Sequence, residues 1–380
     1  MLLEPPAPTA AGTRPIRVLH VVQHLSGGGA ETFVRGLVRG LHARDGLDVR
    51  VLSLYPDGLD AAARAELGAP VMSLERRGRA DLAGFYPRLV AAVRAARPDI
   101  VHAHLHAGKY AGRIGALAAG VPAIVFTEHG DEAGGPVRLA VNRVLHPRTT
   151  RFIVFSEAQR SRFAASEGVP LERIVVIPNG VAEPPAAERE AVRAELGLAP
   201  DAFAVVVPAR MTRQKNQVLA LRAFATAFPR DGTARLLIAG NGALEGALRA
   251  EAGRLGIGER VVFLGFRADV ARLLPGMDAF ALPSVWERMP LALGEAMLAG
   301  LPVVTTPWAG HDGFVADGAT GFVAADWSVA AFADGLRRAR DAAHAMPVAL
   351  RGRASAREAF GLEACVARHA ALYGEVAARR

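Results

Sequence analysis

The segment AFALPSVWERMPLALGEAMLAGLPVVT, residues 279–305, contains an apolar strand, a turn, a helix and a second apolar strand. The predicted strands Ala279–Leu282 and Pro302–Thr305 flank Leu291–Leu298, which has good helix formers, with Pro290 in the first helical turn and Ala299-Gly300 at the end. A helix that connects two strands in this way predicts a parallel βαβ unit, with the helix starting at the carboxyl ends of the strands. Open α/β sheets bind their ligands at that edge.

Two carboxylates lie eight positions apart in this segment, Glu287 in the turn and Glu295 about one and a half turns into the helix. Free backbone N–H groups at a helix start bind phosphate oxygens. A carboxylate further along can accept two hydrogen bonds from a ribose diol, and the upstream carboxylate can reach hydroxyls of a second sugar. A solvated helix face is the ordinary explanation for such a pair, but the position at the carboxyl edge favours a sugar-nucleotide site.

The composition indicates a globular protein of two domains. A chain of 380 residues is longer than one ordinary domain, and 51% hydrophobic against 22% charged residues excludes a disordered chain. Cys365 is the only cysteine, so no intrachain disulfide can form and a reducing compartment is expected. Residues 1–15 are expected to be a disordered tail rather than a signal peptide. Because no apolar run approaches the roughly 20 residues that cross a bilayer, a cytoplasmic location is expected.

The net charge of +8 is modest, and no basic stripe with interleaved aromatic residues points to nucleic acid. The tightest basic cluster, residues 76–79, fits a solvated arginine face, and it also allows peripheral contact with an anionic membrane at the inner membrane face. Only Lys109 and Lys215 among the 45 basic residues are lysines, which singles out these two positions.

Short strands alternate with helices along the chain, which is the pattern of doubly wound parallel α/β sheets. The segment 182–187 interrupts the alternation and is predicted to be a linker. We expect Rossmann-like domains at residues 16–181 and 182–360 with a cleft between them, and a C-terminal helix at residues 361–380 that can cross back to the first domain. The expected strands are 16–22, 48–54, 71–74, 100–103, 123–126, 152–155, 174–177, 204–207, 234–239, 261–264, 279–282 and 302–305. The expected helices are 32–42, 82–96, 110–119, 157–166, 217–227, 244–255, 270–273, 291–298 and a helical region from 329 onward.

Two loops at the ends of predicted strands carry residue types that bind phosphates. Ser26-Gly27-Gly28-Gly29-Ala30-Glu31 leads into a helix, where glycines allow close backbone approach, although a tight turn without a ligand fits equally well. Its spacing does not match G-x-G-x-x-G, which argues against a nicotinamide-dependent dehydrogenase. In the second loop, Arg210 and Lys215 can clamp a diphosphate and stabilise the negative charge of a leaving group without a metal.

Histidines follow two other strands at the same predicted edge. The stretch 101–106 places His102, His104 and His106 on one face of an extended segment, which raises the question of a metal site. Histidines facing a cleft are the simpler explanation, because Cys365 is remote and the chain has no D-x-D motif. His129 ends another strand and can bond a sugar hydroxyl, transfer a proton, or cap the strand.

Six motifs in this order resemble those of the retaining GT-B glycosyltransferases of family 4, which transfer a sugar from a nucleotide sugar. The resemblance covers roughly residues 16–380. The motifs are 27–31, 98–104, 120–122 followed by 127–130, the interdomain Ile177-Pro178-Asn179-Gly180-Val181, the pair Arg210 and Lys215, and the pair Glu287 and Glu295.

The resemblance implies a role for each matching residue. Arg210 and Lys215 would hold the donor diphosphate, Glu295 the ribose and Glu287 the transferred sugar, while His129 would face the reacting sugar. The loop at Gly28 and Gly29 would close over the phosphates. The donor site would be completed by Asn179, Gly240, Phe266 and backbone groups of Met289, Pro290 and Leu291.

The resemblance further implies a metal-independent glycosyltransferase of the hexosyl or N-acetylhexosaminyl class, with no cofactor besides the nucleotide-sugar donor. The departing phosphate would accept the acceptor's proton on the same face of the sugar. The expected acceptor is a glycan, a lipid-linked molecule or a small molecule, in the synthesis of surface polysaccharide or another glycoconjugate. An epimerase or phosphorylase of the same architecture and a non-catalytic glycan-binding module are the alternatives.

The chain departs from the family pattern at two places near the donor sugar. Position 288, usually glycine, is Arg288, and the usual Gly-Gly-x-x-Glu stretch reads Ala309-Gly310-His311-Asp312-Gly313. These changes leave the donor sugar open, and an acidic sugar such as a uronic acid could pair with Arg288.

Overall fold

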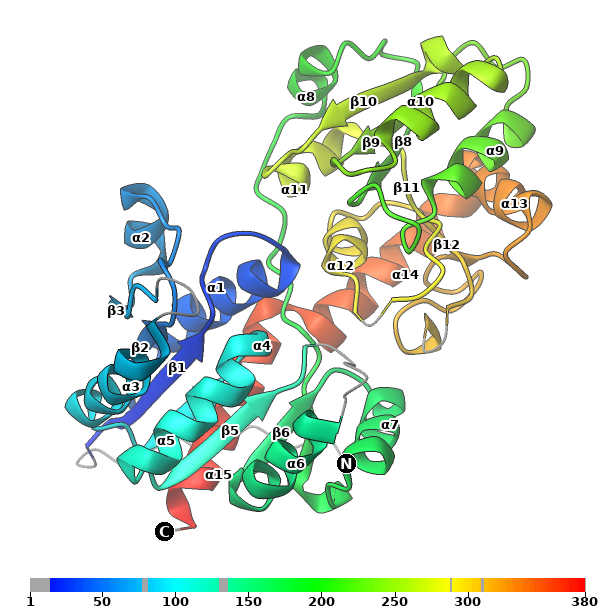
Figure 1. The fold of residues 1–380 in the computed structure, drawn as a ribbon. Helices are drawn as coiled ribbons and strands as arrows, with labels where there is room; N and C mark the ends of the chain where they lie inside the picture. The colour runs from blue at the N-terminus through cyan, green and yellow to red at the C-terminus, as the bar shows by residue number, and fades with distance from the viewer. Residues whose placement is uncertain (1–13, 77–80, 130–135, 288, 309–310, 380) are drawn as a thin grey trace. The chain divides into compact units, whose positions relative to one another are not determined.

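The computed structural model describes residues 14–76, 81–129, 136–287, 289–308 and 311–379, which form two compact units. Unit 1 contains the described residues up to Val181 and those from Leu362 onward, and unit 2 contains residues 182–361. Figure 1 shows that each unit is built on one sheet covered by helices. All strand pairs within the two sheets are parallel, which confirms the expected α/β class with two Rossmann-like halves.

The sheet of unit 1 has seven strands among the described residues, in the order β3-β2-β1-β4-β5-β6-β7. Their bounds are β1 (Ile16–Val22), β2 (Leu47–Ser53), β3 (Val71–Ser73), β4 (Ile100–Ala103), β5 (Ala123–Thr127), β6 (Arg151–Val154) and β7 (Ile174–Val176). The α-helices are α1 (Gly29–His42), α2 (Ala61–Leu67), α3 (Leu82–Ala96), α4 (Leu105–Ala107), α5 (Arg113–Ala119), α6 (Pro136–Leu145), α7 (Glu157–Glu167) and α15 (Leu362–Ala378). A π-helical segment, η2 (Gly108–Gly112), joins α4 to α5.

Helices α1 and α15 pack against one another although more than 300 residues separate them in the sequence (Figure 1). Two glycines of α1 face α15: a Cβ at Gly40 would lie 2.5 Å from the Val366 side chain, and one at Gly36 would lie 3.5 Å from Leu362. The first distance is shorter than van der Waals contact and the second is an ordinary contact. Gly40 therefore allows the close approach that brings the C-terminal helix against unit 1.

The sheet of unit 2 has six strands among the described residues, in the order β10-β9-β8-β11-β12-β13. Their bounds are β8 (Phe203–Pro208), β9 (Ala234–Ala239), β10 (Val261–Gly265), β11 (Ala279–Leu282), β12 (Val303–Thr305) and β13 (Phe322–Val323). The α-helices are α8 (Arg189–Glu195), α9 (Gln217–Ala227), α10 (Glu245–Arg254), α11 (Val270–Leu273), α12 (Leu291–Leu298), α13 (Val329–Arg340) and α14 (Ala342–Phe360). Short 3-10 turns in the two units are His146–Arg148, Leu171–Arg173, Gly258–Arg260, Leu274–Gly276 and His311–Gly313.

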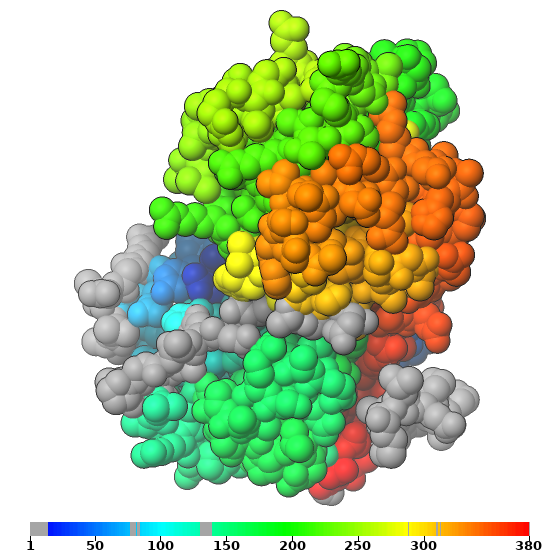
Figure 2. Space-filling model, turned by 90° about the vertical axis from the view of Figure 1, so that its right-hand side faces the viewer, coloured from blue at the N-terminus to red at the C-terminus, as the bar shows by residue number. Residues whose placement is uncertain are grey.

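Helix α13 illustrates how the amphipathic pattern places a helix on the sheet. Its buried side, which includes Phe332 and Leu336, joins one apolar core with residues of β8, β9 and α9, whereas arginines fill its last turn. Ser328 caps its start by accepting a hydrogen bond from the backbone N–H of Ala331. The other side of this helix lies at the surface in the space-filling view, where the region is orange (Figure 2). The pattern is that of a helix buried along one stripe.

The predicted elements agree with the structure in type wherever both exist, and several match to the residue, including β1, β4, β9, β11, α3, α9, α11 and α12. The predicted helix 110–119 is wrong in part, because a π-helical segment occupies its first turn. Among the helices and strands of the described residues, α2, α4, α6, α8 and the two-residue strand β13 were not predicted. Of these, α2, α4, α8 and β13 have seven residues or fewer, which is too short for a periodic pattern to identify.

No helix in the described ranges combines the length and the apolar character that crossing a membrane requires.

Gly40→Ala is expected to destabilise unit 1, because the added methyl group meets Val366. Overpacking of this kind costs about 1–3 kcal/mol, which exceeds the gain of about 1 kcal/mol in helix propensity. Gly36→Ala is the matched control in the same helix: its methyl group has room, so it should leave stability unchanged or raise it. Urea unfolding followed by the near-UV signal of tyrosine measures the effect, since all four tyrosines lie in unit 1. Equal stability of the two variants would contradict the close α1–α15 packing.

Candidate functional site

Glu287 is held rigidly before α12 in unit 2. Its carboxylate accepts a hydrogen bond of 2.6 Å from the Ser284 hydroxyl and forms an ion pair of 2.6 Å with the Lys215 ammonium. The Glu287 side chain is 6% exposed and that of Lys215 is 19% exposed. Two residues that sequence analysis placed in separate motifs, 72 positions apart, are thus in direct contact.

Besides this ion pair, two hydrogen bonds join described residues of the loops after β8 and β11. The backbone N–H of Val285 donates to the carbonyl of Gln214, and the Gln214 amide donates to the carbonyl of Trp286. Lys215 precedes Asn216, which adopts a left-handed conformation at the start of α9. Adjacent parallel strands β8 and β11 bring the two loops to the same edge, so the pairing follows from the topology.

Arg210 is exposed in the loop after β8, and no described residue accepts a hydrogen bond from its guanidinium. Its backbone carbonyl accepts a hydrogen bond of 2.9 Å from the Gln217 amide, which fixes the loop while leaving the charged end available. Gly240 lies beside it with φ at +152°, and a Cβ there would lie 2.1 Å from the carbonyl oxygen of Ala209. Gly240 is therefore required by close backbone packing. Phe266 is 66% exposed.

Glu295 lies in α12, largely buried, and desolvation raises the pKa of its carboxyl group. Within the described part of the chain no residue donates a hydrogen bond to this carboxylate. Helix α12 begins at Leu291 with Pro290 as its N-cap, so Pro290 precedes the first turn, where the sequence had placed it inside. Met289 and Pro290 are buried. A poorly solvated carboxylate next to a helix start is suited to a ligand that brings its own O–H donors.

The glycine loop of unit 1 differs from the expected open phosphate cradle. Helix α1 begins at Gly29, and the backbone N–H of Gly28 donates to the Glu31 carboxylate at 3.0 Å. This capping interaction occupies one of the donors that sequence analysis assigned to phosphate. A phosphate at Gly28 and Gly29 would have to displace the Glu31 side chain.

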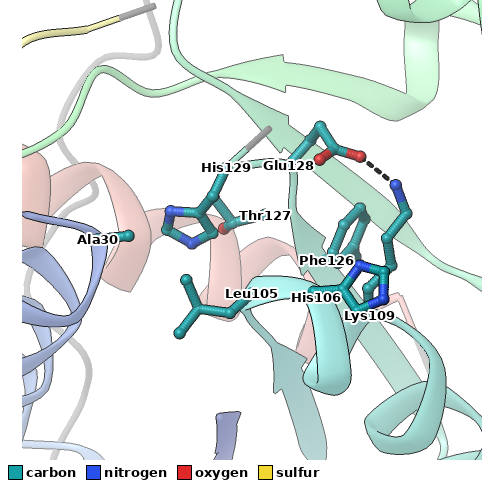
Figure 3. A pocket seen from close by; sticks show the side chains of 8 residues that line it. All are labelled: Ala30, Leu105, His106, Lys109, Phe126, Thr127, Glu128 and His129. Carbon is teal, nitrogen blue, oxygen red and sulfur yellow. Dashed lines mark hydrogen bonds and ion pairs between the residues drawn. The ribbon is translucent and has the colours of Figure 1, made fainter. Parts of the chain in front are cut away.

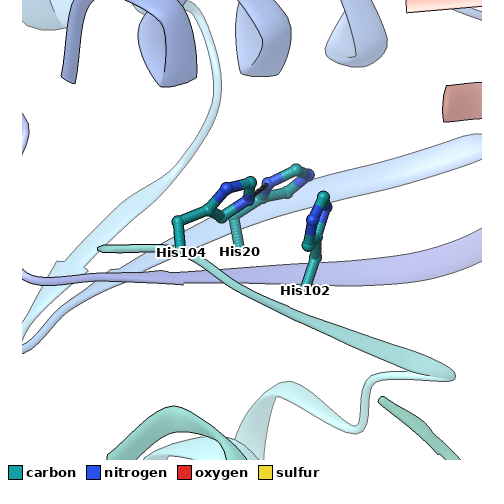
Figure 4. Close-up of side chains that lie close together, drawn as sticks. All are labelled: His20, His102 and His104. Carbon is teal, nitrogen blue, oxygen red and sulfur yellow. Dashed lines mark hydrogen bonds between the residues drawn. The ribbon is translucent and has the colours of Figure 1, made fainter. Parts of the chain in front are cut away.

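Three buried histidines of unit 1 lie together, but they are not the three expected from the sequence. His20, His102 and His104 have ring nitrogens within 4.8 Å of one another (Figure 4). His106 is separated from them, because Leu105 adopts φ at +60° and the chain turns into α4 directly after His104. The extended conformation therefore ends at His104, and His106 does not share a face with His102 and His104.

Burial favours the neutral form of the three clustered histidines and of two that lie near them. His20, His102, His104 and His369 are fully buried, and His129 is partly exposed. Desolvation lowers the pKa of His20 and of His129 to about 3, lowers that of His369 to about 4, and holds the pKa of His102 and His104 well below 6.5. Burial disfavours the charged imidazolium, so these side chains enter the fold as neutral donors and acceptors.

A pocket of about 230 Å³ adjoins the histidines at the carboxyl edge of unit 1 (Figure 3). The ion pair between Lys109 and Glu128 lies on one side of it, and both side chains are buried. Its lining residues are Ala30, Leu105, His106, Lys109, Phe126, Thr127, Glu128 and His129. The pocket can therefore offer an ammonium, a carboxylate and imidazoles to a polar ligand.

Sequence reasoning missed His20, Tyr373 and the pairing of Lys109 with Glu128. The rarity of lysine marked Lys109, but nothing in the sequence pointed to its partner.

Two further groups of predicted residues remain to be placed. Asn179 is 6% exposed in unit 1. The departures at Arg288 and at Ala309 and Gly310, together with Gly130, lie outside the described residues.

Two Rossmann-like units, each with a parallel sheet and polar groups at its carboxyl edge, make up the architecture of the GT-B glycosyltransferases. Residues 27–183 match the family described as Glycosyltransferase Family 4, and residues 202–341 match the one described as Glycosyl transferases group 1. The chain belongs to the family 4 glycosyltransferases of group 1, as its motifs predicted.

Two curated relatives illustrate the similarity. An Escherichia coli UDP-Gal:alpha-D-GlcNAc-diphosphoundecaprenol alpha-1,3-galactosyltransferase is 30% identical over 257 residues, which cover 64% of this chain and 66% of that enzyme. The putative glycosyltransferase EpsF of Bacillus subtilis is 28% identical over 302 residues, which cover 76% of this chain and 78% of EpsF. The chain thus aligns with about two thirds to three quarters of the length of these relatives.

Solved structures share the fold over nearly the whole chain. Anabaena HepE in complex with UDP and glucose superposes with a TM-score of 0.79 at 22% identity, covering 95% of this chain and all of that one. A glycosyltransferase from Rickettsia africae gives a TM-score of 0.82 at 16% identity, covering 96% and 99%. Identities this low establish the fold alone.

Stability of unit 1 is expected to fall as the pH drops from 7.5 towards 5. The histidine pKa values are lowered in the folded state, so the unfolded chain binds more protons below about pH 6.5, and each buried histidine then costs about 1.4 kcal/mol per pH unit. Tyrosine near-UV signals follow unit 1, whereas the three tryptophans all lie in unit 2 and provide an internal control.

His369→Leu tests the assignment of this pH dependence. The variant lacks one buried imidazole and should show a slope shallower by about 1.4 kcal/mol per pH unit. A slope equal to that of the parent protein, measured by urea unfolding at pH 7.5, 6 and 5, would show that His369 is not a buried neutral histidine.

Proposed function

We propose that the chain transfers a hexosyl or N-acetylhexosaminyl group from a nucleotide diphosphate sugar to a glycan, lipid-linked or small-molecule acceptor, with retention of configuration and without a metal. The reaction would serve the synthesis of surface polysaccharide or another glycoconjugate. The observation that carries the proposal is the pairing of Lys215 with Glu287 beside α12, in which Glu295 has no donor among the described residues.

The donor diphosphate would bind to the two cations of the β8 loop. Arg210 has an exposed guanidinium that can bond phosphate oxygens in a bidentate manner. Lys215 already contacts Glu287, so donor binding would place its ammonium between a carboxylate and the phosphates. Cations fixed before the ligand arrives stabilise the charge that develops on the departing phosphate, the role that a metal plays in other transferases.

Glu295 would bind the ribose and Glu287 the transferred sugar. The Glu295 carboxylate is costly to keep ionised, as its raised pKa indicates, and a ribose diol supplies two O–H donors that stabilise the charge. Ser284 and Lys215 fix the orientation of Glu287 in advance, so little side-chain entropy is lost when a sugar hydroxyl binds.

UDP is the nucleotide to examine first. The E. coli relative is named for a UDP-Gal donor and HepE was solved with UDP and glucose. In the proposed retaining reaction, the bond from the anomeric carbon to the diphosphate breaks, and the acceptor oxygen attacks from the same face. A departing phosphate oxygen takes the acceptor's proton. Because an acidic sugar could pair with Arg288, a uronic acid donor belongs among the nucleotide sugars to test.

The proposed location is the cytoplasm, with peripheral contact at the inner membrane face. The lipid-linked acceptor in the name of the E. coli relative supports such contact. Arg76, the described residue of the basic cluster, instead lies 4.7 Å from the centre of the Phe85 ring. A cation–π contact of this kind engages the arginine within the fold, so membrane contact would depend on other residues.

Incubation with UDP-, GDP-, ADP- and dTDP-sugars in the presence of EDTA tests the proposal. We expect slow release of one nucleoside diphosphate by hydrolysis, accelerated by the correct acceptor, with retained configuration. Turnover of a donor to another nucleotide sugar without an acceptor would indicate the epimerase instead. Binding without any release would indicate the non-catalytic module, and loss of transfer on adding EDTA would contradict metal independence.

Glu295→Gln is expected to weaken donor binding by roughly 10-fold or more, since a hydrogen bond to a charged group contributes about 1.5–3 kcal/mol. The same change should raise the melting temperature of the free protein at pH 8, because it removes a carboxylate whose pKa is raised by desolvation. Calorimetric titration and thermal unfolding measure the two effects. Unchanged donor affinity would remove Glu295 from the site.

Lys215→Met is expected to lower kcat by about 100- to 1,000-fold, the usual effect of losing one group that stabilises transition-state charge. Arg213→Met is the matched control, because Arg213 is an exposed cation of the same loop with no described partner. Circular dichroism checks that both variants fold. Equal kcat values for the two variants would show that Lys215 does not act on the leaving group.

A further inference from the structure

Six side chains of unit 1 form one continuous chain of hydrogen bonds. His129 Nε2 lies 3.3 Å from His104 Nδ1, and His104 Nε2 lies 2.9 Å from His20 Nδ1. His20 Nε2 lies 3.5 Å from the Tyr373 hydroxyl, which lies 2.6 Å from His102 Nδ1. His102 Nε2 lies 2.7 Å from the Thr127 hydroxyl. The longest of these links joins Tyr373 to His20.

Both ends of this chain lie at the pocket of unit 1. Thr127 and His129 come from the end of β5 and line the pocket, as Figure 3 shows. His20 and His102 are register partners on the adjacent strands β1 and β4, which places their rings side by side (Figure 4). Tyr373 comes from α15, and it links the two histidines that face it.

The tautomers of the four histidines depend on one another, because each neutral ring has only one proton to donate. A neutral imidazole has one N–H and one bare nitrogen, so a histidine that donates to one neighbour must accept from the other. Tyr373 likewise has one proton to donate, while its oxygen accepts. All links must therefore donate in the same direction along the chain, and reversing one link requires reversing every other.

Thr127 determines the direction. It is fully buried, and the only described hydrogen-bond partner of its hydroxyl is His102. If His102 donated to Thr127, the threonine proton would be buried without a described acceptor, which is costly. With Thr127 as the first donor, each group donates to the next in the order Thr127, His102, Tyr373, His20, His104 and His129. Each of the four histidines then carries its proton on Nδ1.

We propose that this hydrogen-bond chain locks His129 in its Nδ1–H tautomer, so that His129 presents an N–H donor to an oxygen of the bound sugar. Thr127, His102, Tyr373, His20 and His104 are then positioning residues for His129. The sugar contact rests on the proposed function, whereas the tautomer of His129 does not. Free histidine prefers the Nε2–H form, so the lock opposes the intrinsic preference of the ring.

None of the hydrogen bonds described along the chain involves a carboxylate. A carboxylate at any link would accept a proton without passing one on, and it would favour an imidazolium. His369 lies beside the chain without joining it, because its Nδ1 donates to the backbone carbonyl of Cys365 and its Nε2 has no described partner. A carbonyl can only accept, so His369 serves as a reference for the Nδ1–H form.

Nitrogen NMR of the full chain tests the lock directly. Protein with 15N-labelled histidine rings is measured at pH 7.5, with resonances assigned by single substitutions to glutamine. We expect His20, His102, His104 and His129 to show the same Nδ1–H pattern as His369. A Nε2–H pattern or an imidazolium at any of the four would overturn the proposal. Stoichiometric zinc or nickel in the purified protein, found by elemental analysis, would also overturn it, because a metal would take the bare nitrogens.

Tyr373→Phe breaks the middle of the chain while it keeps the aromatic ring. We expect mixed tautomers at His20 and His129 and a 3- to 10-fold lower kcat with an unchanged KM for the donor. His369→Leu removes a neighbouring imidazole and should leave the tautomers as they are. Thr127→Val, which removes the first donor, is the second variant if Tyr373→Phe does not fold. Unchanged tautomers in a folded Tyr373→Phe protein would contradict the lock.

The two proposals fail separately in these measurements. A locked His129 in a protein that transfers no sugar would leave the tautomer assignment standing and refute the proposed function. Sugar transfer by a protein with unlocked histidines would do the reverse.

Discussion

Parallel strand pairing is the constraint on which the placement of polar groups within each unit depends. In each unit the carboxyl ends of the strands meet at one edge, and Lys215, Glu287 and His129 come from loops at such an edge. The βα loops can vary in sequence because the apolar strands already determine the backbone. Charged side chains are therefore found in the loops at the sheet edge, whereas the strands in the core are apolar.

Lys215 and Glu287 show how this edge holds charged side chains in a fixed orientation. Each of the two charges would be costly if buried alone, and together with Ser284 they satisfy one another. Two backbone and amide hydrogen bonds join the same loops, so the pair does not have to hold them together by itself. The arrangement leaves Arg210 and Glu295 as the groups most open to a ligand, one because it is exposed and the other because it lacks a described donor.

Unit 1 uses neutral groups in a comparable position. Burial disfavours imidazolium at five of its histidines, and most of their ring nitrogens are within hydrogen-bond distance of another histidine, Tyr373, Thr127 or a backbone carbonyl. Helix α15 takes part through Tyr373, which explains a requirement for close packing of α15 on α1 at Gly40. The last helix of the chain thus contributes to the site of the first unit.

The sequence by itself determined the class of fold and most elements, because apolar strands and amphipathic helices repeat with distinct periods and the linker interrupts them. It also singled out Arg210, Lys215, Glu287 and Glu295 as candidates, since local motifs place them after a strand or in the helix that follows. Only the tertiary structure decided which of them touch, as for Lys215 and Glu287. It alone replaced His106 by His20 in the histidine cluster and brought in Tyr373, because contacts between strands and a distant helix depend on register and packing, which no local pattern encodes.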